Sequence, residues 1–236
     1  PIIGDIEIFV KNFAEPRIIG ITGTNGKSTT TALVGHILRS AGLPIEVGGN
    51  IGLPVLGFEN TLDAGYQVLE LSSYQLELTP SLCCEIAVIL NISPDHLDRH
   101  GGMDGYKAAK LKIMESLPEN AIAIIGVDDP ESIGIAKWLI ENEYKNLRVI
   151  PISGLIVPEN GVGVLDGNIV SNINRENEVV ISLHDNTILP GVHNWQNVAA
   201  GTAVALTLGI SNNIIKNAIS SFPGLPHRQE LVGTFN

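Results

Sequence analysis

Short apolar runs alternate with longer segments of helical periodicity along most of this chain. Residues 17–22 (RIIGIT) form the first run, and Leu33, Ile37 and Leu38 follow it at the spacing of an amphipathic helix. Strand-like and helix-like segments in alternation predict a parallel sheet covered by helices. The expected strands are 17–22, 45–47, 67–71, 86–90, 121–125 and 148–152, and the expected helices are 28–41, 104–116, 131–142, 195–208 and 212–221.

The pattern changes near residue 161, where short β-like runs follow one another without helical segments between them. The sequence GVGVLDGNIV places Asp166 and Gly167 between two such runs, which is a strong signal for a β-hairpin. The sequence EVVISLHDNTIL predicts a further pair of strands. We therefore expect a small antiparallel sub-region at residues 161–190, and we expect Ser211 to cap the last helix.

The sequence GITGTNGKST, residues 20–29, joins the first strand to the first helix. It departs from the common phosphate-loop pattern G-x-x-x-x-G-K-[ST], because Ile21 stands where the first glycine is required. The physical requirements are nevertheless present: a strand, a turn of residues that tolerate positive φ, and a lysine and a hydroxyl at a helix N-terminus. The candidate nucleotide-binding residues are Gly23, Thr24, Asn25, Gly26, Lys27, Ser28 and Thr29.

In this interpretation Lys27 neutralises the β- and γ-phosphates, and the Ser28 hydroxyl is offered to Mg²⁺. The alternative is a glycine turn with an incidental lysine. The coincidence of strand, loop, Lys-Ser pair and helix favours the phosphate loop. The predicted fold class is therefore α/β, a mostly parallel P-loop-type sheet with helices on both faces and a small antiparallel β patch.

Three further polar segments follow predicted strands, where ligands bind in open parallel sheets. Glu70 lies in the apolar sequence VLELSSYQLE, where it is either a buried metal-binding carboxylate or a glutamate at a water-facing edge; its apolar neighbours favour burial. Asn50 lies in the turn GGNIG, which either lets backbone approach a substrate or is a plain loop. The third segment, NISPDHLDRH, collects Asp95, His96, Asp98, Arg99 and His100.

Composition narrows the possible functions. With 14 basic and 25 acidic residues the net charge is −11, which argues against a general nucleic-acid or membrane-surface protein. Cys83 and Cys84 are adjacent, so they cannot form a zinc site or a disulfide framework, and they indicate a reducing compartment. No stretch is long and apolar enough to span a bilayer, and no signal-peptide pattern is present at the N-terminus. We expect a cytoplasmic protein.

Several motifs, taken in order, resemble the Mur ligases of bacterial cell-wall synthesis. GTNGKST is similar to the ATP loop that this family shares with the folylpolyglutamate synthetases. The other matching motifs are VGGNIG, LELSSYQLE, NISPDHLDRH, YKAAKLKI, HNWQN and GLPHR. The resemblance spans nearly the whole chain, and LSSYQLE is the motif that discriminates among the sister ligases.

The resemblance implies roles for individual residues. Lys27 would bind the ATP phosphates, and Ser28 and Glu70 would hold one Mg²⁺. Glu70 and His96 would hold a second Mg²⁺ near an acyl phosphate. Lys110 matches a lysine that is carbamylated in this family, whereas its own sequence context, AAKLKI, is most simply a solvated helix position. The remaining matches are Asn194, Asn197 and Arg228 on the nucleotide side, and Asn50 and Ser72 on the muramoyl-substrate side.

The implied activity is the ATP-dependent joining of D-glutamate to UDP-N-acetylmuramoyl-L-alanine. The substrate carboxylate would attack the γ-phosphate of ATP, and the amine of D-glutamate would then attack the resulting acyl phosphate. Residues 1–236 would be the central ATP-binding domain, with residues 1–16 as a linker leading into it. A UDP-binding domain would precede it and an amino-acid-binding domain would follow it, in a monomeric enzyme without nucleic-acid or membrane partners.

Two other functions stay open on the residues alone. A P-loop ATPase or nucleotide switch would share Lys27, Ser28 and a strand-end acid, but it would not need Asn50 or Lys110. A non-catalytic nucleotide-binding module is the second possibility. Within the ligases, folylpolyglutamate synthetase is the runner-up, and it is disfavoured because LSSYQLE and GLPHR match the muramoyl enzyme better.

Overall fold

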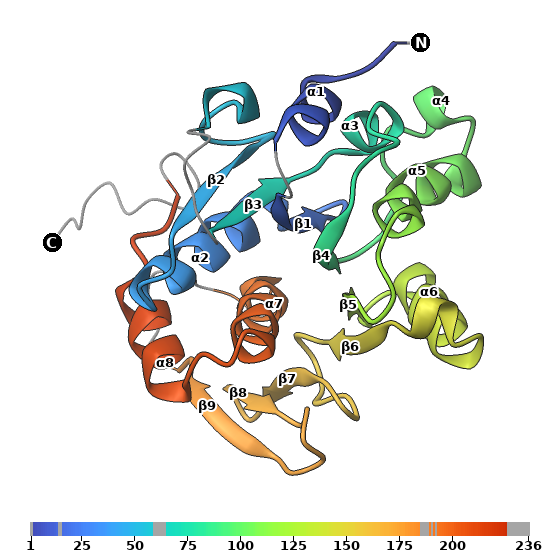
Figure 1. Ribbon diagram of the computed structural model, residues 1–236. Helices are drawn as coiled ribbons and strands as arrows, with labels where there is room; N and C mark the ends of the chain where they lie inside the picture. Colours follow the sequence, from blue (N-terminus) through green and yellow to red (C-terminus); the bar gives the residue numbers. More distant parts are fainter. Residues whose placement is uncertain are drawn as a thin grey trace, which may run out of the picture.

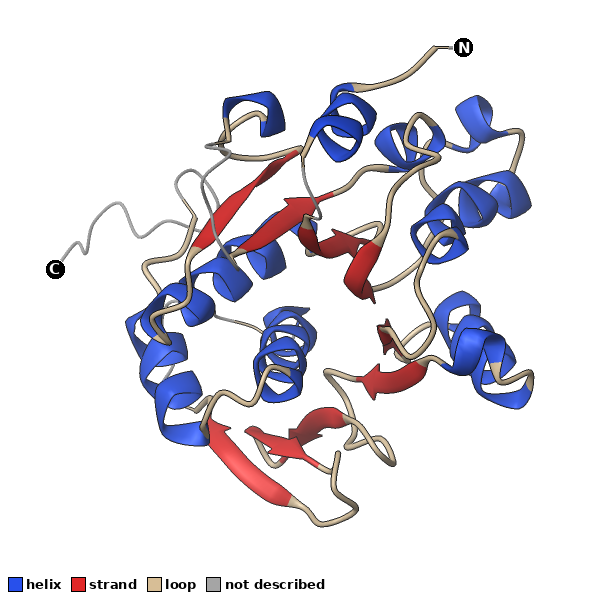
Figure 2. Cartoon of the chain, in the orientation of Figure 1, coloured by secondary structure: helices blue, strands red, loops and turns tan. Residues whose placement is uncertain are grey.

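The sheet contains nine strands in the order β2-β3-β1-β4-β5-β6-β7-β8-β9 (Figures 1 and 2) in the computed structural model, which describes residues 2–13, 16–58, 65–184, 189, 191 and 193–225. Neighbouring strands from β2 to β7 are parallel, whereas β8 and β9 run antiparallel to their neighbours. The strands are β1 Arg17–Thr22, β2 Ile45–Gly49, β3 Tyr66–Glu70, β4 Cys84–Ile89, β5 Ile122–Gly126, β6 Arg148–Ile152, β7 Val162–Leu165, β8 Asn168–Ser171 and β9 Glu178–Ser182.

Helices cover both faces of this sheet (Figure 2). One face is packed by α2, α7 and α8, and the other by α1, α3, α5 and α6. The helices are α1 Asp5–Asn12, α2 Lys27–Ser40, α3 Ser73–Glu77, α4 Leu97–His100, α5 Met103–Glu115, α6 Pro130–Glu141, α7 His193–Thr207 and α8 Asn212–Ser221, with the 3₁₀ turns η1 Val55–Gly57 and η2 Tyr144–Asn146. The prediction of a helix-covered α/β fold is confirmed.

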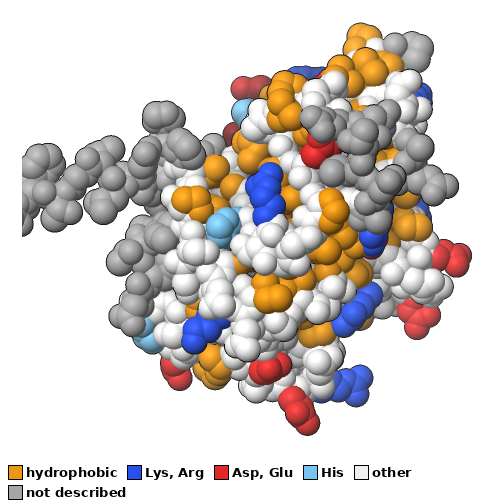
Figure 3. Space-filling model, turned by 60° about the vertical axis from the view of Figure 1, so that its left-hand side comes forward, with side chains coloured by type: hydrophobic (Ala, Val, Ile, Leu, Met, Phe, Trp, Pro, Cys, Tyr) orange, Lys and Arg blue, Asp and Glu red, His pale blue; other side chains and the backbone are white. Residues whose placement is uncertain are grey.

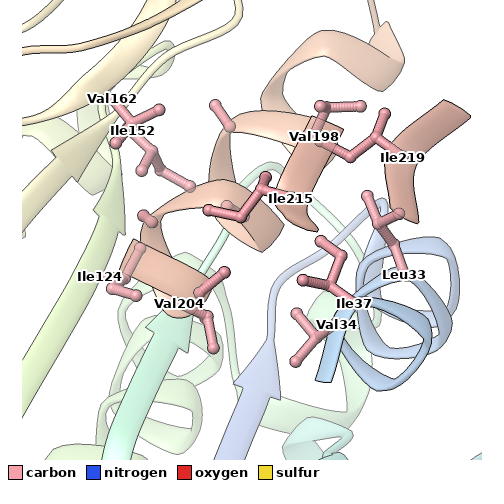
Figure 4. Close-up of a cluster of buried hydrophobic side chains, with 14 of the residues drawn as sticks. Leu33, Val34, Ile37, Ile124, Ile152, Val162, Val198, Val204, Ile215 and Ile219 are labelled. Carbon is pink, nitrogen blue, oxygen red and sulfur yellow. The ribbon is translucent and has the colours of Figure 1, made fainter. Parts of the chain in front are cut away.

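The central strand β4 shows why two separate cores form. Ile86 and Val88 lie in the core under α2 and α7, whereas Ala87 and Ile89 lie in the core under α5 and α6. Successive side chains of a strand point to opposite faces, so a continuous apolar run buries both faces of the sheet. Figure 4 shows the first core, in which Val34 and Ile37 of α2 face Val204 of α7.

The antiparallel region matches the hairpin prediction. Asp166 and Gly167 both have positive φ, 47° and 65°, as a two-residue hairpin turn requires. Of the two strands predicted in EVVISLHDNTIL, the structure contains the first, β9, which pairs with β8. The second would include residues 185–188, which lie outside the described residues, as does residue 190. Ser211 occupies the N-cap position of α8, but its hydroxyl makes no capping hydrogen bond, which differs from our expectation.

The sequence analysis missed helix α1, which lies inside the segment expected to be a linker. Ile6 and Phe9 are fully buried against the α5 side of the sheet. Glu7 is also fully buried, and its carboxylate accepts hydrogen bonds from the backbone N–H (3.0 Å) and hydroxyl (2.8 Å) of Ser81. Residues 5–12 are therefore an integral part of the packed structure.

The surface shown in Figure 3 carries apolar patches, with Lys and Arg side chains scattered singly between them. Within the described ranges no helix has the length and apolar character needed to cross a membrane. The cytoplasmic location, the monomeric state and the absence of a nucleic-acid partner stay predictions.

Candidate functional site

Four parallel strands end side by side at one edge of the sheet. Ile21 of β1 is in register with Glu70 of β3, and Gly49 of β2 is in register with the same Glu70. On the other side of β1, Thr22 is in register with Ile89 of β4. The segments that follow these strands therefore lie together at the carboxyl edge, where open parallel sheets bind their ligands.

The loop after β1 has the backbone geometry of a phosphate-binding turn. Gly23 (φ 155°) and Gly26 (φ 82°) both lie in the region that favours glycine, and Gly26 is the N-cap of α2 without a side-chain cap. Lys27 begins α2, and its Nζ donates to the carbonyl oxygens of Gly23 (2.9 Å) and Thr24 (2.8 Å). Ser28 is buried beside it. Backbone N–H groups, a helix N-terminus and an ammonium thus converge, which is an anion-binding arrangement.

Helix α7, which packs in the first core, contacts this loop through Asn197. A Cβ atom on Gly26 would lie 2.2 Å from Asn197 Oδ1, so only glycine leaves room for that amide. Asn197 Oδ1 accepts from the Thr30 hydroxyl (3.2 Å), and Asn197 Nδ2 donates to Asn194 Oδ1 (3.1 Å). The structure therefore brings the predicted nucleotide residues Asn194 and Asn197 to the phosphate loop, where both are buried.

Asn91, at the end of β4, is a loop contact that the sequence analysis did not single out. Its Oδ1 accepts from the backbone N–H of Asn25 (2.8 Å), and its Nδ2 donates to the Asn25 carbonyl (3.2 Å). Its own carbonyl accepts from the Thr24 N–H at 2.9 Å. The search for polar residues just after strands could have found it, because it is the first residue of NISPDHLDRH.

Lys110 is buried, which contradicts the solvated helix position that its local sequence favoured. Its Nζ donates to the Gly23 carbonyl at 2.8 Å and lies 4.7 Å from the centre of the Tyr106 ring. Burial, and secondarily the Lys27 ammonium, lower the pKa of Lys110 from 10.5 to about 7, while Asp95 opposes the shift. The resemblance alone had singled out Lys110, and the structure places it at the loop.

Glu70 is buried at the end of β3, as the metal interpretation required. Its Oε1 accepts from Asn50 Nδ2 at 3.0 Å, whereas Oε2 is buried without a hydrogen-bond partner among the described residues. A buried carboxylate oxygen without a donor is costly unless a cation or water satisfies it. Asn50 therefore holds one carboxylate oxygen of Glu70, and the other oxygen is left open for a cation.

The glycines of GGNIG have a packing role that the sequence did not reveal. Gly49 has a φ of 97°, and a Cβ there would lie 2.3 Å from the Glu70 carbonyl oxygen. The close approach is thus to the neighbouring strand, and it lets the Asn50 N–H donate to that carbonyl at 2.9 Å. The glycines bring Asn50 to Glu70.

Ser72 caps the short helix α3 through a complete capping box with Gln75. The Ser72 hydroxyl accepts from the Gln75 N–H (3.3 Å), and the Ser72 N–H donates to Gln75 Oε1 (3.0 Å). The sequence analysis assigned Ser72 to substrate binding and missed α3. Two residues of the LSSYQLE motif therefore have a structural function.

The two histidines of the DHLDRH cluster have different environments. His96 is about half exposed, has a φ of 51°, and lies 3.5 Å from Asp95 through its Nε2. His100 has a fully buried side chain, and its Nε2 lies 3.0 Å from the Ser73 hydroxyl. Among the described contacts nothing joins His96 to Glu70, and no three His, Cys, Asp or Glu residues form a metal-binding group in the described part of the chain. Arg228 lies outside the described residues.

The fold and the site together define a nucleotide-binding protein of P-loop type. The mostly parallel sheet is covered by helices, and its first strand β1 leads into a glycine-containing loop followed by a lysine and a serine. The chain belongs to the Mur ligase family, because residues 21–205 match the family model described as Mur ligase middle domain. This confirms the family to which the sequence motifs pointed.

The chain is similar to curated relatives named UDP-N-acetylmuramoylalanine–D-glutamate ligase. It is 50% identical to the protein of that name from Rhodospirillum rubrum over 232 residues, which cover 98% of the chain and 48% of the relative. It is 42% identical to the one from Rickettsia felis, over 100% of the chain and 51% of the relative. The chain thus spans about half the length of the curated relatives it matches.

Solved structures of lower identity share the fold. UDP-N-acetylmuramate:L-alanyl-gamma-D-glutamyl-meso-diaminopimelate ligase from Neisseria meningitides matches with a TM-score of 0.69 at 18% identity, over 94% of this chain and 71% of that one. MurF ligase from Thermotoga maritima, in complex with ADP, matches with a TM-score of 0.63 at 20% identity, over 93% of this chain and 51% of that one.

Proposed function

We propose that this chain is the ATP-binding middle domain of an ATP-dependent ligase that joins D-glutamate to UDP-N-acetylmuramoyl-L-alanine in peptidoglycan precursor synthesis. The observation that carries the proposal is the 50% identity to the Rhodospirillum rubrum ligase over 98% of the chain. The family model, described as a middle domain, supports flanking UDP-binding and amino-acid-binding domains. We propose a cytoplasmic, monomeric enzyme, as the sequence predicts.

The phosphate loop is the proposed ATP site, and the ADP complex of the Thermotoga maritima neighbour supports it. The N–H groups of the loop and of the first turn of α2 bind the phosphates. Lys27 exchanges its bonds to the Gly23 and Thr24 carbonyls for bonds to the β- and γ-phosphates. Asn194 and Asn197 hold the adenine side, and Arg228 is proposed near the ribose.

The donor atoms at the sheet edge fit Mg²⁺, which prefers carboxylate and hydroxyl oxygens. Glu70 Oε2 has no hydrogen-bond partner among the described residues, and Ser28 lies in the first turn of helix α2. We propose Ser28 and Glu70 as ligands of one Mg²⁺, and Glu70, His96 and a carbamylated Lys110 at a second. When bound, these ions neutralise the charge that develops on the transferring phosphoryl group.

Two features favour the carbamate of Lys110. Carbamates form from neutral amines, and a pKa of about 7 leaves a large neutral fraction at physiological pH. Conversion to an anion would also remove the repulsion between Lys110 and Lys27, the second cause of the lowered pKa. The carbamate nitrogen would keep one hydrogen, with which it could still donate to the Gly23 carbonyl.

The proposed reaction has two steps. The carboxylate of UDP-N-acetylmuramoyl-L-alanine, positioned by Asn50 and Ser72, attacks the γ-phosphorus of ATP, and ADP leaves. The amine of D-glutamate then attacks the acyl phosphate carbon, loses a proton and expels phosphate to form the amide. In the first step this chain holds the phosphates in line and balances their charge through Lys27.

The test uses the full-length enzyme that contains this chain, supplied with ATP, Mg²⁺, UDP-N-acetylmuramoyl-L-alanine and D-glutamate. We expect phosphate release and an amide product by chromatography, both dependent on each substrate. Lys27→Ala should lose turnover and weaken ATP binding while the circular dichroism spectrum is retained. Product formation with glutamate and a folate substrate, or phosphate release independent of D-glutamate, would contradict the proposal. Residues 1–236 alone should bind Mg²⁺-ATP at best weakly and form no amide.

A further inference from the structure

A relay of side-chain hydrogen bonds leads away from the phosphate loop toward the ends of β5 and β6. It starts at Asn91, which brackets the Asn25 peptide as described above. Asn91 Nδ2 also donates to Gln196 Oε1 of α7 at 3.2 Å, and Gln196 Nε2 donates to Asp128 Oδ2 at 2.9 Å. Asp128, which follows β5, does not itself contact the loop in any described hydrogen bond.

Asp128 is anchored at the far end of this relay. Its Oδ2 accepts from the Gly154 N–H at 2.7 Å, and its Oδ1 accepts from the Ser153 hydroxyl. Both partners belong to the segment directly after β6. The carboxylate is therefore tied to a different strand end from the one that carries the phosphate loop.

The carboxylate can set the orientation of both amides. An ionised carboxylate only accepts hydrogen bonds, so Gln196 must turn its NH₂ group toward Asp128 and its oxygen toward Asn91. Asn91 must then present its NH₂ group to Gln196, which leaves its oxygen to accept from the Asn25 N–H. Without the carboxylate, either amide could turn over and point oxygen at oxygen.

The fold leaves room for the middle of the relay. A Cβ atom on Gly154 would lie 3.0 Å from the Gln196 backbone nitrogen, and one on Gly126 would lie 2.9 Å from Gln196 Nε2. Gln196 is itself buried. A polar side chain enclosed in this way, with both ends of its amide bonded, is held in one orientation.

We propose that Asp128 is a positioning residue for the phosphate loop, acting through Gln196 and Asn91 on the peptide of Asn25. The relay holds the Asn25 N–H and carbonyl in one direction before any ligand arrives. This inference deepens the proposed function and rests on it for the consequence for nucleotide binding. The relay itself is a property of the ligand-free chain.

The first experiment measures hydrogen exchange of the Asn25 amide by NMR without nucleotide. Asn91→Ala removes the direct bond, so exchange should be about tenfold faster, the equivalent of about 1.4 kcal/mol for one hydrogen bond. Asp128→Ala should accelerate it about threefold through misorientation of the amides, a partial loss of the same bond. The double variant should exchange no faster than Asn91→Ala, because among the described hydrogen bonds only the path through Gln196 and Asn91 joins Asp128 to the loop.

Asn172→Ala is the matched control. Asn172 also joins a backbone N–H, that of Asn160 (3.1 Å), to a side-chain amide, that of Asn177 (2.7 Å), but it lies near β8. Exchange at Asn25 should be unchanged in it. If Asp128→Ala fails to fold, Gln196→Met interrupts the relay at its middle and should give the same threefold effect. Unchanged exchange in the folded Asp128 or Gln196 variant, or additive effects in the double variant, would overturn the relay.

The second experiment measures ATP affinity by calorimetry in the full-length enzyme. We expect about threefold weaker binding for Asp128→Ala, about tenfold for Asn91→Ala, and the same tenfold for the double variant. If the parent protein does not bind ATP, the proposed function fails, and the exchange data still decide the relay. If the parent binds ATP and folded Asp128→Ala binds it equally well, the positioning role is wrong.

Discussion

Replacement of Gly26 by alanine tests the contact between the phosphate loop and α7. Gly26 has a φ of 82°, and the left-handed conformation costs an L-residue roughly 1–2 kcal/mol. The new Cβ would also lie 2.2 Å from Asn197 Oδ1, so that amide must move. Its bonds to Thr30 and Asn194 would break, at a cost of about 0.5–1.5 kcal/mol each. The expected loss of unfolding free energy is about 2–5 kcal/mol.

Gly42 provides a matched control at the other end of the same helix. Its φ is 77°, and a Cβ there would meet nothing within 4 Å. Gly42→Ala therefore carries the conformational cost of about 1–2 kcal/mol without the collision. The effect of alanine on the unfolded chain is common to both variants and cancels in their difference. That difference, about 1–3 kcal/mol, measures the contact with Asn197.

The assay is urea unfolding followed by circular dichroism, with equal slopes required before midpoints are compared. We expect Gly26→Ala to unfold at a lower urea concentration than Gly42→Ala. In an Asn197→Ala background, which removes the colliding amide, Gly26→Ala should cost no more than Gly42→Ala. Equal losses for the two glycine variants in the parent background would refute the packing of Asn197 against the loop.

Two further predictions concern the charged groups of the site. Glu70→Gln keeps an oxygen for Asn50 but removes the charge, so ATP affinity should lose its dependence on Mg²⁺, while the affinity without Mg²⁺ is unchanged. If Mg²⁺ raises ATP affinity in the variant as much as in the parent, Glu70 is not a metal ligand. For Lys110, the folded pKa of about 7 lies below the unfolded value of 10.5, so between these two pH values the unfolded chain binds more protons and the unfolding free energy should rise with pH. Lys110→Met should lack this rise in CO₂-free buffer. Unfolding free energies of variant and parent that change with pH in parallel would contradict the prediction.

The fold was predictable because its signals are local. The run 86–89 is apolar at every position, so both faces of β4 had to be buried. The Asp166-Gly167 pair specified its hairpin turn. Helix α1 was missed because its DIEIFV sequence alternates like a strand. Its helical state is supported by tertiary contacts, among them the bonds between Glu7 and Ser81.

The site was less predictable, because its defining contacts join distant parts of the chain. Lys110 and Gly23 are separated by 87 positions, and no local pattern distinguishes a buried lysine from an exposed one in a helix. In the same way, nothing in DHLDRH indicates that His100 is enclosed while His96 is half exposed. Residue types after the strands predicted which segments meet at the edge, and the packing of α5 and α7 decided which atoms touch.

The contacts of Gly23 connect the two lysines of the site. Both Lys27 Nζ (2.9 Å) and Lys110 Nζ (2.8 Å) donate to its carbonyl oxygen. An anion at the helix N-terminus attracts the Lys27 ammonium away from that carbonyl, and burial makes an unpaired carbonyl costly. Lys110 Nζ can keep the oxygen satisfied when Lys27 leaves, because it keeps at least one hydrogen as an amine and would keep one as a carbamate. The Gly23 carbonyl can therefore stay hydrogen-bonded while the Lys27 ammonium moves to a bound anion, and the buried Lys110 is the residue that makes this possible.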